Sequence, residues 1–395
     1  MNAKLHSNRQ TIDSIDRRLI ELIGQRIKAV RSIGETKNQD SGSRLYDPQR
    51  ERAVFDQWSS AAAEEGLSSY YVGRILREML NYSRRVQEGV LRREEATVSR
   101  PVTRVGFQGV NYSYSYLAAR KLFDCRDKTC VEPIGYRTFG AAIEALVNAE
   151  VDYSLLPIEN TIAGSINETY HLIKEKQLSI VDEEVWSVEH CLAGLPGSDL
   201  DNIRTIRSHP VALQQCQTLL AKTTWASAEV FFDTAAAAES LVTEGDASIA
   251  AICSPECAAE LGLTVLKEKV ADQAHNYTRF VLISREPEKV DRRQPCKTSL
   301  RLALNHRQGA LARVLDTFAS RGINLTKLES RPKPETPWEY EFFVDLEGHH
   351  EDAQLAEALD LVEDHTNYMI VLGSYPRRNV ELVELPKPER GNRSA

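Results

Sequence analysis

The first 95 residues have the apolar spacing of long helices and no pattern typical of strands. From residue 8 to about residue 37, apolar side chains recur at three- and four-residue steps, the period of one helix face; they are Ile12, Ile15, Leu19, Leu22, Ile23, Ile27, Val30 and Ile33. A second helix is predicted to begin at Asp47-Pro48, with Asp47 as its N-cap, and a third to run from Tyr70 to about Arg93. Residues 1–95 are therefore expected to form an all-helical domain.

The pattern changes after a polar, proline-containing segment at residues 94–104, which is expected to be a linker. Short apolar stretches such as VGFQG, DYSLLPIEN and VLIS then alternate with helix-like stretches such as YLAARKLF. This alternation predicts an α/β domain with parallel strands over residues 103–284. Residues 285–297 are charged and contain proline, as expected of a second linker.

The last patterned segment covers residues 298–377. Its strand-like and helix-like stretches follow in the order β-α-β-β-α-β, which predicts an α+β module of the ferredoxin-like type. The polar tail from Arg377 onward is expected to be disordered. The chain is thus predicted to be multidomain, with an all-α domain, an α/β domain and an α+β module.

Composition narrows the classes of function. The 395 residues include 49 Lys+Arg and 57 Asp+Glu, and the net charge of −8 argues against nucleic-acid binding, which needs a basic surface. The longest apolar runs have five residues, far fewer than the roughly 18 of a membrane span. The N-terminal residues also lack the apolar core of a signal peptide. We therefore expect a cytoplasmic protein without nucleic-acid or membrane partners.

The seven cysteines form no CxxC pair and stand apart from the nine histidines, so we predict reduced thiols, no metal site and no cofactor. Cys253 and Cys257 are spaced to share a helix face, and their apolar neighbours favour buried thiols.

Charge is unevenly distributed along the chain. Residues 1–95 hold 17 Lys+Arg and 14 Asp+Glu, net +3, so the other 300 residues carry 32 against 43, net −11. Within the basic segment, polar residues are spaced to share helix faces: Arg26 with Lys37, Asp47 with Arg50 and Glu51, and Ser83 with Gln87. Each group alone could be ordinary surface charge. Together with Arg9, the full set resembles the helical type of chorismate mutase, which occurs fused to prephenate dehydratase in bifunctional enzymes.

The resemblance implies a site that holds the dianion chorismate during a one-molecule rearrangement to prephenate. By resemblance, Arg9 and Arg26 would bind the two carboxylates, and the catalytic Lys37 and Gln87 would donate hydrogen bonds to the ether oxygen. Glu51 and the Asp47 region would contact the ring hydroxyl, and Ser83 and Arg50 would support the substrate. On one continuous helix, Arg9 and Arg26 lie 17 residues apart, about 25 Å. One substrate cannot span that distance, so if both arginines bind one substrate, Arg9 must come from another subunit and the protein must be at least a homodimer.

Three short motifs mark the α/β segment. The strand-like DYSLLPIEN ends in the turn Glu159-Asn160-Thr161, and Ser208-His209-Pro210 stands where a helix is expected to begin. Thr278-Arg279-Phe280 comes immediately before the strand-like VLIS. Ligands in open α/β sheets bind at such strand ends and helix starts. Over about residues 104–284 these motifs resemble prephenate dehydratase, whose fold has two α/β lobes around a cleft, similar to periplasmic binding proteins.

That resemblance implies prephenate as substrate, which loses carbon dioxide and hydroxide and becomes aromatic. Thr278 would donate a proton or hydrogen bond to the departing hydroxyl and Arg279 would orient a carboxylate, while Asn160, Thr161 and Ser208 would line the cleft. Water or Glu159 could relay the proton to Thr278. His209 is open to two interpretations, an acid–base residue or a structural histidine beside proline.

The C-terminal segment resembles the ACT domain of phenylalanine-regulated enzymes through its GAL and ESRP motifs. The resemblance implies L-phenylalanine bound at an interface between two ACT modules by Gly309, Ala310, Leu311, Glu329, Ser330, Arg331 and Pro332. A purely structural dimerisation module is the alternative interpretation.

The sequence thus predicts a bifunctional enzyme of phenylalanine biosynthesis, inhibited by its end product. Two alternatives remain at this point: a dehydratase with a vestigial mutase domain, and a small-molecule sensor without catalysis.

Overall fold

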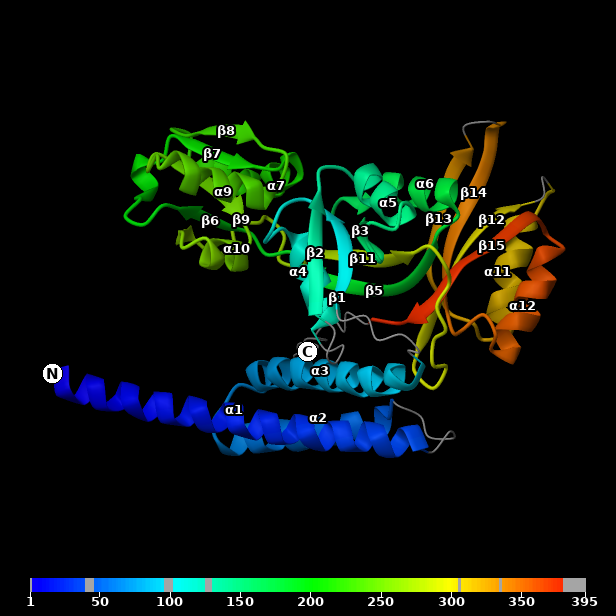
Figure 1. Cartoon of the computed structure of the whole chain (residues 1–395), viewed down its shortest axis with the longest axis horizontal. Helices are drawn as coiled ribbons and strands as arrows, with labels where there is room; N and C mark the ends of the chain where they lie inside the picture. Colours follow the sequence, from blue (N-terminus) through cyan, green and yellow to red (C-terminus); the bar gives the residue numbers. More distant parts are fainter. Residues whose placement is uncertain are drawn as a thin grey trace, which may run out of the picture.

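The computed structural model describes residues 2–39, 46–95, 102–124, 130–304, 307–333 and 336–378, arranged as Figure 1 shows. The first domain consists of three helices, α1 (Asn2–Gln39), α2 (Pro48–Glu64) and α3 (Ser69–Glu95). Asp47 caps α2 by accepting a hydrogen bond from the backbone nitrogen of Arg50 at 3.0 Å. The prediction of three helices is confirmed, and α1 and α3 extend a few residues further than expected.

Only the carboxyl-terminal half of α1 packs within its own domain. There Val30 is buried, and Gly34 lies against Gln87 and Val90 of α3. In the other half the apolar stripe is open: the exposed fractions of Ile12, Ile15, Leu19, Ile20 and Leu22 are 50% or more. Figure 1 shows this half of α1 extending beyond the ends of α2 and α3.

The α/β segment forms two lobes. The first lobe has a mixed sheet in the order β2-β1-β3-β11-β5, with the two-residue β4 beside β3. Its strands are β1 (Val102–Gln108), β2 (Cys130–Tyr136), β3 (Tyr153–Asn160), β4 (Gly164–Ser165), β5 (Ser179–Ser187) and β11 (Tyr277–Ser284), and its helices are α4 (Tyr114–Phe123), α5 (Phe139–Val147) and α6 (Asn167–Lys176).

The expectation of parallel strands is correct for β1, β2 and β3 and wrong for β11. After β5 the chain leaves to build the second lobe, and on its return β11 inserts between β3 and β5, antiparallel to both. A further difference is that β11 already includes Thr278 and Arg279, which the sequence placed just before the strand.

The second lobe has the strand order β10-β6-β9-β7-β8. Its strands are β6 (Cys191–Gly194), β7 (Thr205–Ser208), β8 (Ser227–Val230), β9 (Ile249–Cys253) and β10 (Thr264–Lys267); its helices are α7 (Pro210–Gln215), α8 (Gln217–Lys222), α9 (Thr234–Glu244) and α10 (Pro255–Glu260), with the short 3-10 turn η1 (Leu200–Asn202). The chain crosses between lobes at residues 188–190 and 268–276. The two crossings are joined by the backbone nitrogen of Val188, which donates to the Asn276 carbonyl at 2.7 Å.

The C-terminal module has the predicted β-α-β-β-α-β order and an antiparallel sheet, β13-β14-β12-β15. Its elements are β12 (Cys296–Leu304), α11 (Ala310–Ser320), β13 (Leu325–Lys333), β14 (Thr336–Glu347), α12 (Ala353–Glu363) and β15 (Thr366–Pro376). Phe343, Leu372 and Tyr375 of this module are buried in the same core as Ile158 and Val281 of the first lobe. The module is therefore packed onto that lobe and shares its hydrophobic core.

Two segments expected to be linkers or tail make specific contacts. Lys297, the second residue of β12, is almost fully buried and pairs with Glu183 at 2.8 Å, and Arg285 donates to the carbonyls of Leu146 and Val151. The expectation of disorder from Arg377 onward is wrong for the first two residues, because Arg377 and Arg378 both form ion pairs. Residues 379–395, and residues 96–101 of the first linker, lie outside the described residues.

Five cysteine side chains belong to the described part of the chain, and all five are free and buried, including Cys253 and Cys257 as predicted. None of the described helices combines the length and apolarity that crossing a membrane requires.

Arg378 joins all three domains, and its loss is expected to destabilise the fold. Its side chain, 12% exposed, contacts Glu88 of α3 at 2.6 Å and the buried Asp182 of β5 at 3.1 Å. Arg378→Ala removes the cation from two shielded carboxylates and should cost about 3 kcal/mol in the free energy of unfolding. The matched control Arg377→Ala breaks a pair with Glu347 that is 30% exposed on both sides, and should cost less than about 1 kcal/mol. Urea unfolding of the full chain measures both; equal losses would contradict this assignment.

Candidate active sites

The predicted residues Thr278 and Asn160 lie opposite each other on β11 and β3. Asn160 Nδ2 donates to Thr278 Oγ1 at 2.9 Å, and both residues are only 9% exposed. The amide orientation of Asn160 follows from its other oxygen, Oδ1, which accepts from the backbone nitrogens of Ile162 and Ala163 at 3.0 and 2.8 Å. Because Thr278 Oγ1 accepts this hydrogen bond, its own proton is free to be donated to a different group.

Thr161 holds the turn after β3 against β11. Its hydroxyl accepts from the backbone nitrogen of Tyr277 at 2.9 Å, and its own backbone nitrogen donates to the Tyr277 carbonyl. The structure therefore brings Asn160, Thr161 and Thr278 together, as the motifs predicted.

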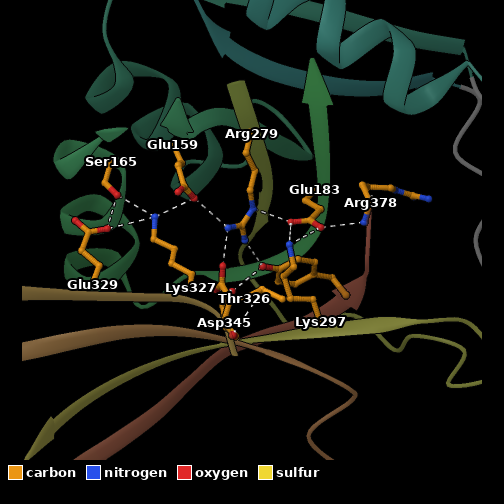
Figure 2. A network of polar contacts seen from close by, with 12 residues as sticks. Glu159, Ser165, Glu183, Arg279, Lys297, Thr326, Lys327, Glu329, Asp345 and Arg378 are labelled. Atoms are coloured by element: carbon orange, nitrogen blue, oxygen red, sulfur yellow. Dashed lines mark hydrogen bonds and ion pairs between the residues drawn. The ribbon is translucent and has the colours of Figure 1, made fainter. Parts of the chain in front are cut away.

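Arg279 and Glu159 form the next pair in the same register, but successive side chains on a strand point to opposite faces. Figure 2 shows Arg279 among residues of the C-terminal module, and strand alternation places the Thr278 side chain on the other face of the sheet. Its guanidinium contacts Glu183 at 2.7 Å, Asp345 at 2.6 Å and the Tyr375 hydroxyl at 2.8 Å. The structure thus does not bring Arg279 together with Thr278.

Glu159 faces the same way as Arg279. Its carboxylate lies 3.5 Å from Arg279 and 3.0 Å from Lys327 of β13. A direct proton relay from Glu159 to the Thr278 hydroxyl, one option left open by the sequence, does not fit this placement on opposite faces of the sheet.

Charges in this network compensate one another despite their burial. Burial by itself raises the pKa of Asp345, but Arg279 and Lys297 outweigh it, and the pKa of the carboxyl lies below its ordinary value. Glu183 is fully buried and accepts from Arg279, Lys297 and the backbone nitrogen of Arg378. Arg279, which the resemblance assigned to a substrate carboxylate, thus links the first lobe to the C-terminal module.

The second lobe contributes Ser208 and His209. The Ser208 hydroxyl is fully buried and donates to the Ile252 carbonyl at 2.6 Å within that lobe. His209 is the N-cap of α7, and its Nδ1 accepts from the backbone nitrogen of Val211 at 3.3 Å. Burial lowers the pKa of His209, in keeping with a neutral ring that accepts this bond. The structural interpretation of His209 is therefore favoured.

The first loop of the α/β segment touches the second lobe at Gly109. This glycine has φ +117°, and a Cβ there would lie 2.8 Å from Asp233 Oδ2 and 2.9 Å from Ser113 Oγ. Asp233 caps α9 in the second lobe and is itself buried. The absence of a side chain at residue 109 is thus what lets the two lobes approach at this point.

In the helical domain, Arg26 of α1 reaches α3. Its guanidinium donates to the Ser83 hydroxyl and to the Met79 carbonyl, and burial lowers the pKa of Arg26. Gly34, about one helical turn before Lys37, packs against Gln87 of α3: a Cβ added to Gly34 would lie 3.4 Å from the Gln87 Cα and Cγ atoms. Arg26, Ser83 and Gln87 therefore lie along one α1–α3 seam, and Lys37 follows Gly34 by about one turn of α1.

The other mutase residues are placed differently. Glu51 of α2 forms a two-point ion pair with Arg84 of α3, and Arg84 also lies 4.7 Å from the ring centroid of Tyr46. Asp47 serves as the α2 cap, and Arg50 is exposed. The sequence motifs did not point to Arg84 as a site residue, although its position three residues before Gln87 places both on the same face of α3.

Arg9 is exposed on the projecting half of α1, and α1 is continuous between Arg9 and Arg26. The premise of the two-subunit argument, one unbroken helix, is therefore met.

In the C-terminal module, Gly309 starts α11 at φ +76° with Ala310 buried behind it. Glu329 and Arg331, on the edge strand β13, turn toward the first lobe: Glu329 accepts from the Ser165 hydroxyl, and Arg331 lies 4.5 Å from the Tyr170 ring centroid. Ser330 and Pro332, which alternate with them, are exposed. Within the described residues, no group of three or more His, Cys, Asp or Glu is placed to hold a metal ion.

Three family models match the chain in order: chorismate mutase type II at residues 8–88, prephenate dehydratase at 105–288 and the ACT domain at 298–360. The bifunctional chorismate mutase/prephenate dehydratase of Escherichia coli is 31% identical over 376 residues, covering 95% of this chain and 97% of that protein. The chain belongs to this bifunctional family. Both activities are therefore assigned to it, in preference to a vestigial mutase domain or a sensor.

Two solved structures resemble the dehydratase and ACT portions. The prephenate dehydratase of Arthrobacter aurescens, solved with L-Phe, is 32% identical with a TM-score of 0.61 and covers 70% of this chain and 90% of that one. GqqA, described as a novel type of quorum-quenching acylase, is 34% identical with a TM-score of 0.61 and covers 70% and 98%. The two-lobed fold with an ACT module is thus shared by proteins described with different activities.

Gly109→Ala should weaken the dehydratase without affecting the mutase. The added Cβ meets Asp233 of the opposite lobe, so the lobes should separate and KM for prephenate should rise about tenfold or more, as expected for a displaced buried contact of 1–3 kcal/mol. Gly197→Ala is the matched control, because Gly197 has φ +88° with nothing within 4 Å of the Cβ position. Steady-state kinetics with prephenate measure KM for both variants. An equal KM in the two would contradict the prediction, because backbone strain alone would then explain the effect of Gly109→Ala.

Proposed function

We propose that the helical domain converts chorismate to prephenate and that the two-lobed domain converts prephenate to phenylpyruvate, carbon dioxide and water, under feedback inhibition by L-phenylalanine. The three functional units correspond to residues 1–95, 103–284 and 298–377. The observation that carries the proposal is the Asn160–Thr278 pair within a chain that matches the bifunctional family along 95% of its length. Free, buried thiols at the described cysteines support a reducing, cytoplasmic setting.

In the dehydratase reaction, the ring carboxylate of prephenate leaves as carbon dioxide and its bonding electrons enter the ring. Aromatisation expels the ring hydroxyl, which needs a proton to leave as water. The Thr278 proton is free because Asn160 donates to its oxygen, and the same Asn160 hydrogen bond stabilises the negative charge that builds on Thr278 Oγ1 as the proton departs. Solvent then returns a proton to Thr278. Thr161 would border the site beside Asn160, while the buried Ser208 would shape the second lobe through its hydrogen bond to the Ile252 carbonyl.

In the mutase reaction no nucleophile is needed, because bonds break and form within one molecule. The protein holds the compact conformer and stabilises charge on the ether oxygen. Arg26, oriented by Ser83, would bind one carboxylate, and Lys37 and Gln87 would donate to the ether oxygen. Glu51, held by Arg84, would accept from the ring hydroxyl.

Regulation has a physical route from β13 to the dehydratase strands. The proposed effector residue Glu329 contacts Ser165 and Lys327, Lys327 pairs with Glu159, and Glu159 pairs with Arg279 (Figure 2). Glu159 and Arg279 directly neighbour Asn160 and Thr278 in the chain. L-Phenylalanine that draws Glu329 or Arg331 away from the first lobe would therefore alter the strands that carry the reacting groups.

Thr278→Val and Arg26→Ala should separate the two activities. Thr278→Val keeps the side-chain shape but removes the proton donor, so phenylpyruvate formation should fall by about 100-fold or more while chorismate is still consumed at the wild-type rate. Arg26→Ala should do the reverse, with dehydration of added prephenate unchanged. The measurement is phenylpyruvate and chorismate absorbance with and without L-phenylalanine. Loss of both activities in either variant, or no response of the wild type to L-phenylalanine, would contradict the respective part of the proposal.

The mutase site is proposed to be completed by a second copy of the chain. The projecting half of α1 carries Arg9 together with an exposed apolar stripe, and a partner's helical domain would cover both. Arg9→Ala and Arg26→Ala homodimers should each have little mutase activity, but a mixture allowed to exchange subunits should regain up to about a quarter of wild-type activity per chain, because half of the dimers are mixed and each of these has one intact site. Failure to regain activity, despite exchange shown by a tagged subunit, would mean that the sites are not shared.

A further inference from the structure

A line of hydrogen-bonded side chains continues from Asn160 away from the reacting groups; Asn276 and His190 are buried, and Gln215 and Tyr114 are half-buried. Asn160 Nδ2 donates to Asn276 Oδ1 at 2.7 Å, and Asn276 Nδ2 donates to Gln215 Oε1 at 3.0 Å. The same Gln215 oxygen lies 3.1 Å from His190 Nε2. The other ring nitrogen, His190 Nδ1, lies 2.9 Å from the Tyr114 hydroxyl. Asn276 and His190 are 1% and 2% exposed, so water does not replace these partners.

The direction of each hydrogen bond follows from the one before it. Backbone nitrogens fix the Asn160 oxygen, so its nitrogen must face Asn276, whose nitrogen in turn must face Gln215. Gln215 Oε1 can only accept, so His190 must carry its proton on Nε2. The bare Nδ1 then accepts from Tyr114, whose proton is shared with the carbonyl of Glu189 at 2.6 Å. Burial lowers the pKa of His190, in keeping with this neutral form.

The line also joins the two lobes. Tyr114 belongs to α4 of the first lobe and Gln215 to α7 of the second, while His190 and Asn276 lie on the two segments that cross between them. Backbone hydrogen bonds hold both crossings in place, from Val270 to the His190 carbonyl and from Val188 to the Asn276 carbonyl. These backbone hydrogen bonds hold the two lobes relative to each other, while the side-chain line fixes the orientation of the Asn160 amide.

We propose that His190, held by Tyr114, is a positioning residue of the dehydratase: through Gln215 and Asn276 it fixes the Asn160 amide and thereby the direction in which Thr278 presents its proton. His190 is not itself the acid, because it is buried and both ring nitrogens are engaged within the protein. Without its Nε2 proton, the Gln215 amide can rotate, Asn276 can follow, and Asn160 loses a fixed acceptor. The inference rests on the proposed dehydratase function.

The test uses the full chain with three variants. His190→Leu removes both ring nitrogens, and kcat for prephenate should fall about 30-fold with KM changed less than about twofold, since the loss falls on orientation and not on binding. His190→Gln restores an N–H donor at the ε position and should recover kcat to within about threefold of wild type. Tyr114→Phe should lower kcat by a smaller factor. Mutase turnover should be unchanged in all three.

Thr223→Val is the control for loss of a buried polar group, because Thr223 is 3% exposed in the second lobe and its hydroxyl donates to the Leu219 and Leu220 carbonyls, away from the Asn160 line. It should leave kcat unchanged even if the melting temperature drops. Equal kcat in His190→Leu and His190→Gln, a wild-type kcat in His190→Leu, or losses that follow the melting temperature across all variants would overturn the proposal.

An independent readout separates this inference from the proposed function. In ¹⁵N-histidine NMR spectra of the full chain, the signal lost in His190→Leu should show a neutral ring protonated on Nε2, and Asn276→Ala should shift it. A ring protonated on Nδ1, or no shift in Asn276→Ala, overturns the inference whatever the enzyme does. If the wild type instead forms no phenylpyruvate, the proposed function fails while the NMR result still decides whether the line of contacts exists.

Discussion

A buried run of three acidic residues on β5 determines how the domains fit together. Asp182, Glu183 and Glu184 are at most 1% exposed, and buried carboxylates without cationic partners would cost several kcal/mol each. Strand alternation turns Glu183 toward the ACT module, where it pairs with Lys297 of that module and with Arg279 of the neighbouring strand β11. Glu184 pairs with Arg85 of the helical domain. The lobe, the regulatory module and the mutase domain are therefore held by the same short strand.

The register between β11 and β3 places the proposed reacting residues and the residues that contact the ACT module on opposite faces of the sheet. Thr278 pairs with Asn160 on one face of the sheet, and Arg279 pairs with Glu159 on the other, where the ACT module docks. A shift of one residue would exchange the two faces and destroy both functions at once. The hydrophobic core shared by the first lobe and the ACT module stabilises this register, since Val281 and Ile283 follow on the same strand and are fully buried.

The sequence predicts the helices and the β-α-β-β-α-β order of the ACT module, because helical period and strand alternation are local signals. The Asn160–Thr161–Thr278 group follows from short motifs that resemble prephenate dehydratase. It could not predict the placement of Arg279, since only the insertion of β11 between β3 and β5 decides which face meets a partner domain. Arg378 was assigned to a disordered tail because its partners, Glu88 and Asp182, are distant in sequence. His190 belongs to no motif, Asn276 stands two residues before Thr278 without a role that the sequence indicates, and only the crossing of two segments between lobes brings them together.

The unbroken α1 helix has a consequence for how the protein behaves on dilution. If the Arg9 end of α1 works only inside a neighbouring copy, chorismate turnover depends on the fraction of assembled chains, which follows mass action. The Asn160–Thr278 pair, by contrast, lies wholly within one chain. The ratio of the two catalytic rates would then vary with protein concentration, and a bifunctional polypeptide would release more or less of its own intermediate according to its abundance in the cell.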